Sequence, residues 1–126
     1  GERILSPEVC EVMRGILAEV VSRGTGRRAG LDDNMGGKTG TAEKVIDGRY
    51  SSEHHYALFV GMAPIDNPRL VVLIAVDDPT GARSGGAVAA PAVGDVLRRS
   101  LAILAAEDAR CPRDRSLKNA AESIKP

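Results

Sequence analysis

The strongest constraint on the fold is a pair of strand-like segments joined by an Asp-Gly turn. Residues 36–46 are rich in Gly, Thr and β-branched residues, which is typical of a strand. Asp47 and Gly48 follow, and this dipeptide is a strong signal for a two-residue hairpin. Strand-like sequence resumes at residues 55–63, and residues 69–77 form a third segment with little polar interruption. We therefore predict three antiparallel neighbouring strands.

A first amphipathic helix is predicted to precede these strands. Residues 6–8 (Ser-Pro-Glu) provide an N-cap, a first-turn proline and an early acidic residue. The apolar residues that follow at helical spacing are Val9, Val12, Met13, Ile16, Leu17, Val20 and Val21. We expect the helix to stop near Arg23, because Gly24 and Gly26 would supply the left-handed conformations of a helix end.

A second amphipathic helix is predicted after a glycine-containing loop at residues 79–86. Its apolar positions are Val93, Val96, Leu97, Leu101 and Leu104. Pro91 fits only in the first turn of this helix. From residue 107 onward the charges crowd and the apolar periodicity fades, so we predict a mobile tail over residues 107–126.

Composition and charge exclude several classes of function. The chain has 17 basic and 17 acidic residues, so no net charge would attract nucleic acid or an anionic membrane surface. The longest apolar run, residues 70–76, is too short to cross a bilayer. Cys10 and Cys111 lack C-x-x-C spacing and imply neither a zinc site nor a disulfide framework. We predict one α/β unit of the α+β type, a mainly antiparallel sheet flanked by helices, with no cofactor and no metal.

Residues 36–44 (Gly-Gly-Lys-Thr-Gly-Thr-Ala-Glu-Lys) carry the candidate chemistry, and two mechanisms compete for them. A phosphate-binding loop matches only residues 37–39. That motif requires a glycine where Asp32 stands, and it requires a helix after Thr39, where strand-like sequence follows. The alternative is the K-T-G strand of serine β-lactamases and penicillin-binding proteins.

The K-T-G interpretation gives each residue of the strand a physical role. Lys38 would place a cation near a nucleophile and an anionic substrate. Thr39 and Thr41 would offer hydroxyl groups to a carboxylate, and the backbone N–H of Thr41 would donate to a developing oxyanion. Gly40, which has no side chain, would let an extended peptide lie close to the strand.

With its flanking motifs, this strand resembles the end of a class B penicillin-binding protein of the septal peptidoglycan transpeptidase type. The flanking motifs are Gly24-Thr25-Gly26, Phe59-Val60-Gly61-Met62-Ala63-Pro64, Pro68-Arg69-Leu70 and Gly85-Gly86-Ala87-Val88-Ala89-Ala90-Pro91. The resemblance extends from residue 6 to about residue 104. It implies that residues 1–106 form the C-terminal portion of the β-lactamase and transpeptidase-like fold.

The resemblance also implies a function for the parent protein. That protein would be a serine-type D,D-transpeptidase that cross-links peptidoglycan stem peptides and is inhibited by β-lactams. Lys38 would be the catalytic residue of this segment, and Thr39, Gly40 and Thr41 would bind substrate. The parent would act at the periplasmic face of the bacterial inner membrane, anchored by a segment outside this chain, with cell-division proteins as further partners.

Two departures from the family pattern qualify these expectations. Neither S-x-x-K nor S-x-N occurs at any serine of the chain, so the nucleophile is absent and this segment alone is predicted to be inactive. The alternative is a noncatalytic module that recognises cell-wall peptide or a division partner. In addition, Arg83 and Ser84 stand where the family usually has two aromatic residues. Sheet surface left uncovered in such a segment would favour self-association.

The other polar residues near the strands are assigned structural roles. His54 and His55 are adjacent, so on a strand they face opposite sides and cannot chelate one metal together. We interpret Lys44 as a solvated strand residue, and the pair Asp77-Asp78 as turn formers. Gly85-Gly86 is predicted to serve close backbone packing beneath the site.

Overall fold

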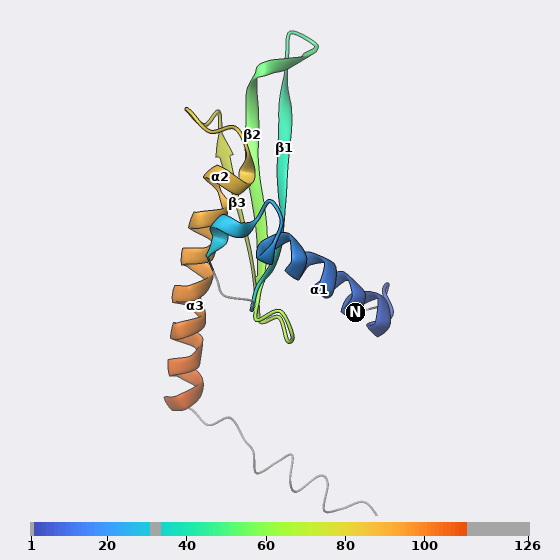
Figure 1. The fold of residues 1–126 in the computed structure, drawn as a ribbon, viewed down its shortest axis with the longest axis vertical. Coiled ribbons are helices and arrows are strands. Elements are labelled where there is room, and N and C mark those ends of the chain that lie inside the picture. The colour runs from blue at the N-terminus through green and yellow to red at the C-terminus, as the bar shows by residue number, and fades with distance from the viewer. Residues whose placement is uncertain (1, 31–33, 111–126) are drawn as a thin grey trace, which may run out of the picture.

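The computed structural model describes residues 2–30 and 34–110, which form a three-stranded sheet with helices packed against it (Figure 1). The elements in chain order are α1 (Pro7–Ser22), the 3-10 turn η1 (Arg27–Ala29), β1 (Gly36–Ile46), β2 (Arg49–Ala63), β3 (Leu70–Asp77), α2 (Gly85–Val88) and α3 (Ala90–Arg110). The strand order is β1-β2-β3 and both pairings are antiparallel. The predicted fold class and strand arrangement are therefore confirmed.

The Asp-Gly turn forms the predicted hairpin between β1 and β2. Asp47 has a φ of 51° and Gly48 a φ of 77°, as a tight turn with two left-handed residues requires. Ile46 pairs with Arg49 directly across the turn. The strand β2 thus begins at Arg49 and not at residue 55 as predicted, because pairing with β1 holds residues 49–54 in the sheet despite their polar sequence.

The first helix ends where predicted, but the glycines after it act differently. The backbone N–H of Arg23 donates to the carbonyl of Glu19 at 3.0 Å and ends α1. Gly24 and Gly26 are not among the described glycines with positive φ. They permit close approach instead: a Cβ on Gly24 would lie 2.8 Å from the backbone oxygen of Val20, and one on Gly26 would lie 3.0 Å from the ring of Phe59.

The core lies between one face of the sheet and the helices α2 and α3. Phe59, in the middle of β2, is fully buried, and Val93 and Leu97 of α3 lie against the same face. Gly61 makes this packing possible, because a Cβ there would lie 2.8 Å from Val93. The helix α1 packs against the start of β1, where Gly36 leaves room for Leu17, and its Val21 belongs to the same core cluster.

The C-terminal helix α3 is longer than the sequence pattern indicated. Pro91 stands in its first turn, as predicted, and the helix runs to Arg110. Residues 107–110, which the sequence pattern places in the mobile tail, are therefore helical. The rest of that predicted tail lies outside the described residues. In the part of the chain that the structure describes, no helix is both long and apolar enough to span a membrane.

Candidate functional site

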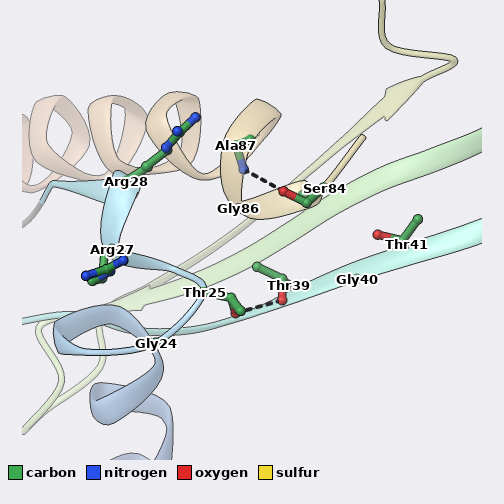
Figure 2. Close-up of a pocket in the computed structure, with 11 residues that line it drawn as sticks. Gly24, Thr25, Arg27, Arg28, Thr39, Gly40, Thr41, Ser84, Gly86 and Ala87 are labelled. Atoms are coloured by element: carbon green, nitrogen blue, oxygen red, sulfur yellow. Dashed lines mark hydrogen bonds between the residues drawn. The ribbon is translucent and has the colours of Figure 1, made fainter. Parts of the chain in front are cut away.

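A groove with a volume of about 350 Å³ opens between β1, the connection from α1 to η1, and α2 (Figure 2). One wall is the strand segment Thr39-Gly40-Thr41. The facing wall is the segment Ser84-Gly85-Gly86-Ala87 at the start of α2. Gly24 and Thr25 lie between these walls at one end of the groove (Figure 2). The groove therefore brings together three of the sequence motifs quoted above.

Three of the four predicted site residues line this groove, and the fourth does not. Side chains alternate along a strand, so Thr39 and Thr41 share one face of β1 while Lys38 lies on the other. The Nζ of Lys38 donates a hydrogen bond of 2.9 Å to the backbone oxygen of Thr39. Lys38 is solvent-exposed in this arrangement. Its ammonium group is thus adjacent to the threonine wall but outside the groove.

A hydrogen bond between two threonine hydroxyls connects the strand to the end of α1. The Oγ1 atoms of Thr25 and Thr39 are 3.0 Å apart. Whichever hydroxyl donates, the other retains its own hydrogen and can donate it to a ligand. Thr25 was recognised only as part of a glycine-flanked motif, and its contact with Thr39 requires the chain to fold back on itself.

The wall formed by Gly85 and Gly86 is packed tightly against backbone. A Cβ on Gly85 would lie 1.8 Å from the backbone oxygen of Leu58, and a Cβ on Gly86 would lie 2.1 Å from that of Thr25. The hydroxyl of Ser84 caps the following turn by accepting from the backbone N–H of Ala87 at 3.3 Å. The predicted role of Gly85-Gly86 in close packing is confirmed.

Two arginines bring positive charge to the groove. Arg27 and Arg28 lie at its margin, both are exposed, and none of the lining residues within 2–30 and 34–110 is acidic. A concave site with this charge attracts an anion and repels a cation. No role is predicted for these two arginines from the sequence. Their position directly after the Gly24-Thr25-Gly26 motif was the available signal.

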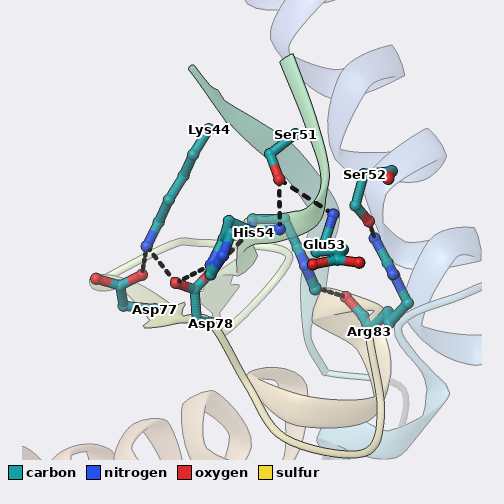
Figure 3. Close-up of polar contacts among 9 residues, drawn as sticks. Lys44, Ser51, Ser52, Glu53, His54, Asp77, Asp78 and Arg83 are labelled. Atoms are coloured by element: carbon teal, nitrogen blue, oxygen red, sulfur yellow. Dashed lines mark hydrogen bonds and ion pairs between the residues drawn. The ribbon is translucent and has the colours of Figure 1, made fainter. Parts of the chain in front are cut away.

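A cluster of charged residues lies near the turn end of the sheet, where β3 ends (Figure 3). Lys44 crosses the ring of Tyr56, with its Nζ 4.8 Å from the ring centroid. The same Nζ forms ion pairs with Asp77 and with Asp78, the latter at 2.7 Å. The interpretation of Lys44 as a solvated residue is therefore wrong, because its side chain is long enough to reach across β2 and is only 20% exposed.

These ion pairs lower the pKa of Asp78 and raise the pKa of Lys44. Hydrogen bonds from Lys44 and then from His54 hold the pKa of Asp78 well below its usual range. Hydrogen bonds to Asp77 and Asp78 raise the pKa of Lys44 well above its usual range. Asp78 also has a φ of 41°, so it does occupy a turn conformation as predicted, but its carboxylate has a further role in holding the cluster together.

Acid is expected to remove the stabilisation that Asp78 provides. Because its pKa is lowered in the folded state, the carboxylate stabilises the fold above the ordinary aspartate pKa of about 3.9, and this contribution is lost as the pH falls further. The Asp78→Asn variant should therefore melt at a lower temperature than the unmodified protein at pH 7. The difference should shrink below about pH 4, as measured by thermal unfolding followed by circular dichroism.

The matched control for this measurement is Asp66→Asn. Asp66 is exposed and takes part in no ion pair among the described residues. Its variant should melt within error of the unmodified protein at both pH values. A pH-independent difference for Asp78→Asn would contradict the assigned role of the carboxylate.

Comparison with known proteins identifies the family. The model of the penicillin-binding protein transpeptidase domain matches residues 1–98. The chain therefore belongs to the penicillin-binding protein transpeptidase family and is a segment of that domain. This confirms the resemblance inferred from the ordered motifs.

Named relatives and solved structures agree with this assignment. Stage V sporulation protein D of Bacillus subtilis is 48% identical over 102 residues, which are 79% of this chain and 16% of that protein. The probable peptidoglycan D,D-transpeptidase PenA of Neisseria flavescens is 37% identical over 107 residues, 82% of this chain and 27% of that protein. These relatives support the class B assignment.

Among solved structures, the transpeptidase domain of penicillin-binding protein 3 from Burkholderia pseudomallei is similar, with a TM-score of 0.73 and 40% identity. The match covers 82% of this chain and 32% of that one. Penicillin-binding protein 3 of Mycobacterium tuberculosis, in complex with ampicillin, matches with a TM-score of 0.67 and 29% identity, over 80% of this chain and 26% of that one. The chain thus spans less than a third of the length of the relatives and structures described here.

Proposed function

We propose that this chain supplies the substrate-binding strand of a serine-type D,D-transpeptidase that cross-links peptidoglycan stem peptides. The observation that carries the proposal is the groove in which Thr39, Gly40 and Thr41 face a glycine wall, with two arginines and no acidic residue among the described residues of its lining. Such a groove suits an extended peptide with a free terminal carboxylate. The ampicillin complex of the Mycobacterium tuberculosis protein supports β-lactams as ligands of the complete domain.

The strand residues have distinct roles in this proposal. The hydroxyls of Thr39 and Thr41 bind the terminal carboxylate of a stem peptide ending in D-Ala-D-Ala, and Gly40 lets the peptide lie against the strand edge. The serine of an S-x-x-K motif, in another part of the domain, attacks the penultimate carbonyl and expels the terminal D-Ala. The backbone N–H of Thr41 donates to the oxyanion that forms. An amine of a neighbouring stem peptide then displaces the serine and completes the cross-link.

In this proposal Lys38 contributes its positive charge, and its side chain does not line the groove. Its ammonium group, next to Thr39, stabilises the anionic substrate and lowers the cost of deprotonating the nucleophile. In the complete domain this requires the nucleophile to approach the free edge of β1.

Covalent labelling tests the proposal. The purified chain and a complete transpeptidase domain containing it would each be incubated with a fluorescent penicillin, followed by a denaturing gel and intact mass. We expect the complete domain to gain one penicillin and this chain alone to gain none, because neither serine motif occurs in it.

Each other outcome contradicts a definite part of the proposal. An adduct on the isolated chain would show that one of its own serines is reactive. A complete domain that binds stem peptide but gains no penicillin would be the noncatalytic module, and the enzymatic proposal would be wrong.

Location and partners follow from the same proposal. The complete protein would work at the periplasmic face of the inner membrane, anchored by another segment, together with cell-division proteins. Apolar side chains on the sheet face opposite the core support contact with the rest of the domain, since Val71 and Leu73 are 65% and 61% exposed. The isolated chain is therefore expected to self-associate, and a sharp monomer in sedimentation at high concentration would contradict this.

A further inference from the structure

The loop that leads from β3 to the glycine wall is fixed at its first residue, Asp78. The Oδ2 of its carboxylate accepts from the Nζ of Lys44 at 2.7 Å and from the Nδ1 of His54 at 2.9 Å. The Oδ1 accepts from the backbone N–H of His55 at 2.8 Å, and the backbone N–H of Asp78 donates to the carbonyl of His55 at 3.0 Å. Four contacts thus hold Asp78 beside β2 (Figure 3).

The far end of the same loop is held by His55. This side chain is 2% exposed, and its Nε2 lies 3.1 Å from the backbone oxygen of Arg83. A carbonyl oxygen only accepts, so Nε2 must be the donor of this hydrogen bond. The Nδ1 is buried and has no hydrogen-bond partner among residues 2–30 and 34–110. A buried polar ring with one nitrogen unpaired is costly, which indicates that the bond to Arg83 is the reason for its position.

Arg83 does not reach into the groove, although the family usually has an aromatic residue there. Its guanidinium group turns away and donates to the backbone oxygen of Ser52 on β2 (Figure 3). The residue is thus held through both its backbone and its side chain. The next residue, Ser84, caps α2 and begins the wall of the groove.

The Gly85-Gly86 wall is packed so closely that it cannot move nearer to the strands. A Cβ on Gly85 would overlap the carbonyl oxygens of Leu58 and Gly40, at 1.8 and 2.9 Å. The wall can therefore move away from the strand but not towards it. Without an anchor at Arg83, the loop would be free to relax outward and widen the groove.

We propose that His55 is a positioning residue that sets the width of the groove by holding the backbone of Arg83, and thereby the Gly85-Gly86 wall, at a fixed distance from Thr39 and Thr41. His55 is not among the residues that line the groove, and it acts through the two-residue step from Arg83 to Gly85. The expected effect of His55 on the acylation rate rests on the proposed transpeptidase function. Its expected effect on the position of the loop does not depend on that function.

Two variants separate the hydrogen bond from the bulk of the ring. The His55→Leu variant fills the site but leaves the Arg83 carbonyl unpaired, whereas the side-chain amide of His55→Gln can donate to it as Nε2 does. In the complete domain, the rate of acylation by a fluorescent penicillin should fall at least about fivefold in His55→Leu, the effect of one lost buried hydrogen bond. It should return to within about twofold in His55→Gln if the donor is restored.

Hydrogen–deuterium exchange gives a second readout that does not depend on catalysis. Backbone exchange over residues 83–88 should speed up in His55→Leu and recover in His55→Gln, while exchange in α1 stays unchanged. Equal exchange over residues 83–88 in all three proteins would overturn the inference. So would faster exchange throughout the fold, because His55 would then be a general core residue.

The two readouts also distinguish this inference from the proposed function. If the unmodified complete domain is not acylated at all, the transpeptidase proposal fails, and exchange over residues 83–88 still decides whether His55 holds the wall. If the domain is acylated and both variants react at the unmodified rate, the positioning role fails while the proposed function stands.

Discussion

The Gly85→Ala substitution is expected to destabilise the purified protein by about 3 kcal/mol or more, the upper part of the range for overpacking. The added methyl carbon would lie 1.8 Å from the backbone oxygen of Leu58 and 2.9 Å from that of Gly40. Both obstacles are backbone atoms of strands that pair with each other, so neither can move without breaking the sheet. Thermal or denaturant unfolding measures the loss directly.

Gly15→Ala is the matched control for Gly85→Ala. Gly15 is exposed in the middle of α1, and a Cβ there would meet nothing within 4 Å. This substitution should raise stability by up to about 1 kcal/mol, because alanine is a better helix former than glycine. Equal effects of the two substitutions would contradict the tight packing of the Gly85 wall.

The Lys38→Ala substitution is expected to reduce acylation of the complete domain by fluorescent penicillin about 10²- to 10³-fold, which is typical for loss of one electrostatic contact to a transition state. The melting temperature should change little, because Lys38 is exposed and its hydrogen bond is made to the backbone of its own neighbour. Stopped-flow or time-resolved labelling measures the rate.

Two further substitutions test whether the effect of Lys38→Ala is specific. Lys38→Arg keeps the charge but changes the donor geometry and should recover only part of the rate. Arg49→Ala removes an exposed cation at the start of β2, outside the groove. The domain with this substitution should be acylated at the unmodified rate. An acylation rate of Lys38→Ala within twofold of the unmodified rate would show that Lys38 has no role at the site.

The parts of the fold that depend on local chemistry could be predicted from the sequence. The Asp47-Gly48 turn was predictable because few residue pairs accept two successive positive φ angles. The start of α1 was predictable because Ser6 can cap the N–H of Val9. In both cases the deciding interaction lies within a few residues of the chain.

The parts that depend on distant contacts could not be predicted. Residues 49–54 read as a polar connection, and only their pairing with β1 makes them a strand. Lys44 read as solvated, because no local pattern shows that a side chain on β1 crosses β2 to reach Asp77. Gly24 was assigned a left-handed role, whereas its lack of a side chain serves the close approach to Val20.

The same distinction applies to the candidate site. Thr39, Gly40 and Thr41 stand together in the sequence and together in the groove. The partner of Thr39 stands fourteen residues away, at Thr25, and the facing glycine wall is more distant still. Spacing along the chain identifies the strand of such a site, but the opposite wall exists only after folding.

Under the proposed function, the construction of that opposite wall has a consequence for resistance to β-lactams. Gly85 and Gly86 present backbone to the groove, and backbone chemistry cannot be altered by a point mutation. A variant that escapes an inhibitor while retaining activity must therefore change the few side chains that do face the ligand, or the residues that anchor the loop from outside, such as His55 and Arg83. Resistance substitutions in this segment should accordingly occur at side chains on the margin of the groove or at the residues that anchor the loop, and not at Gly85 or Gly86.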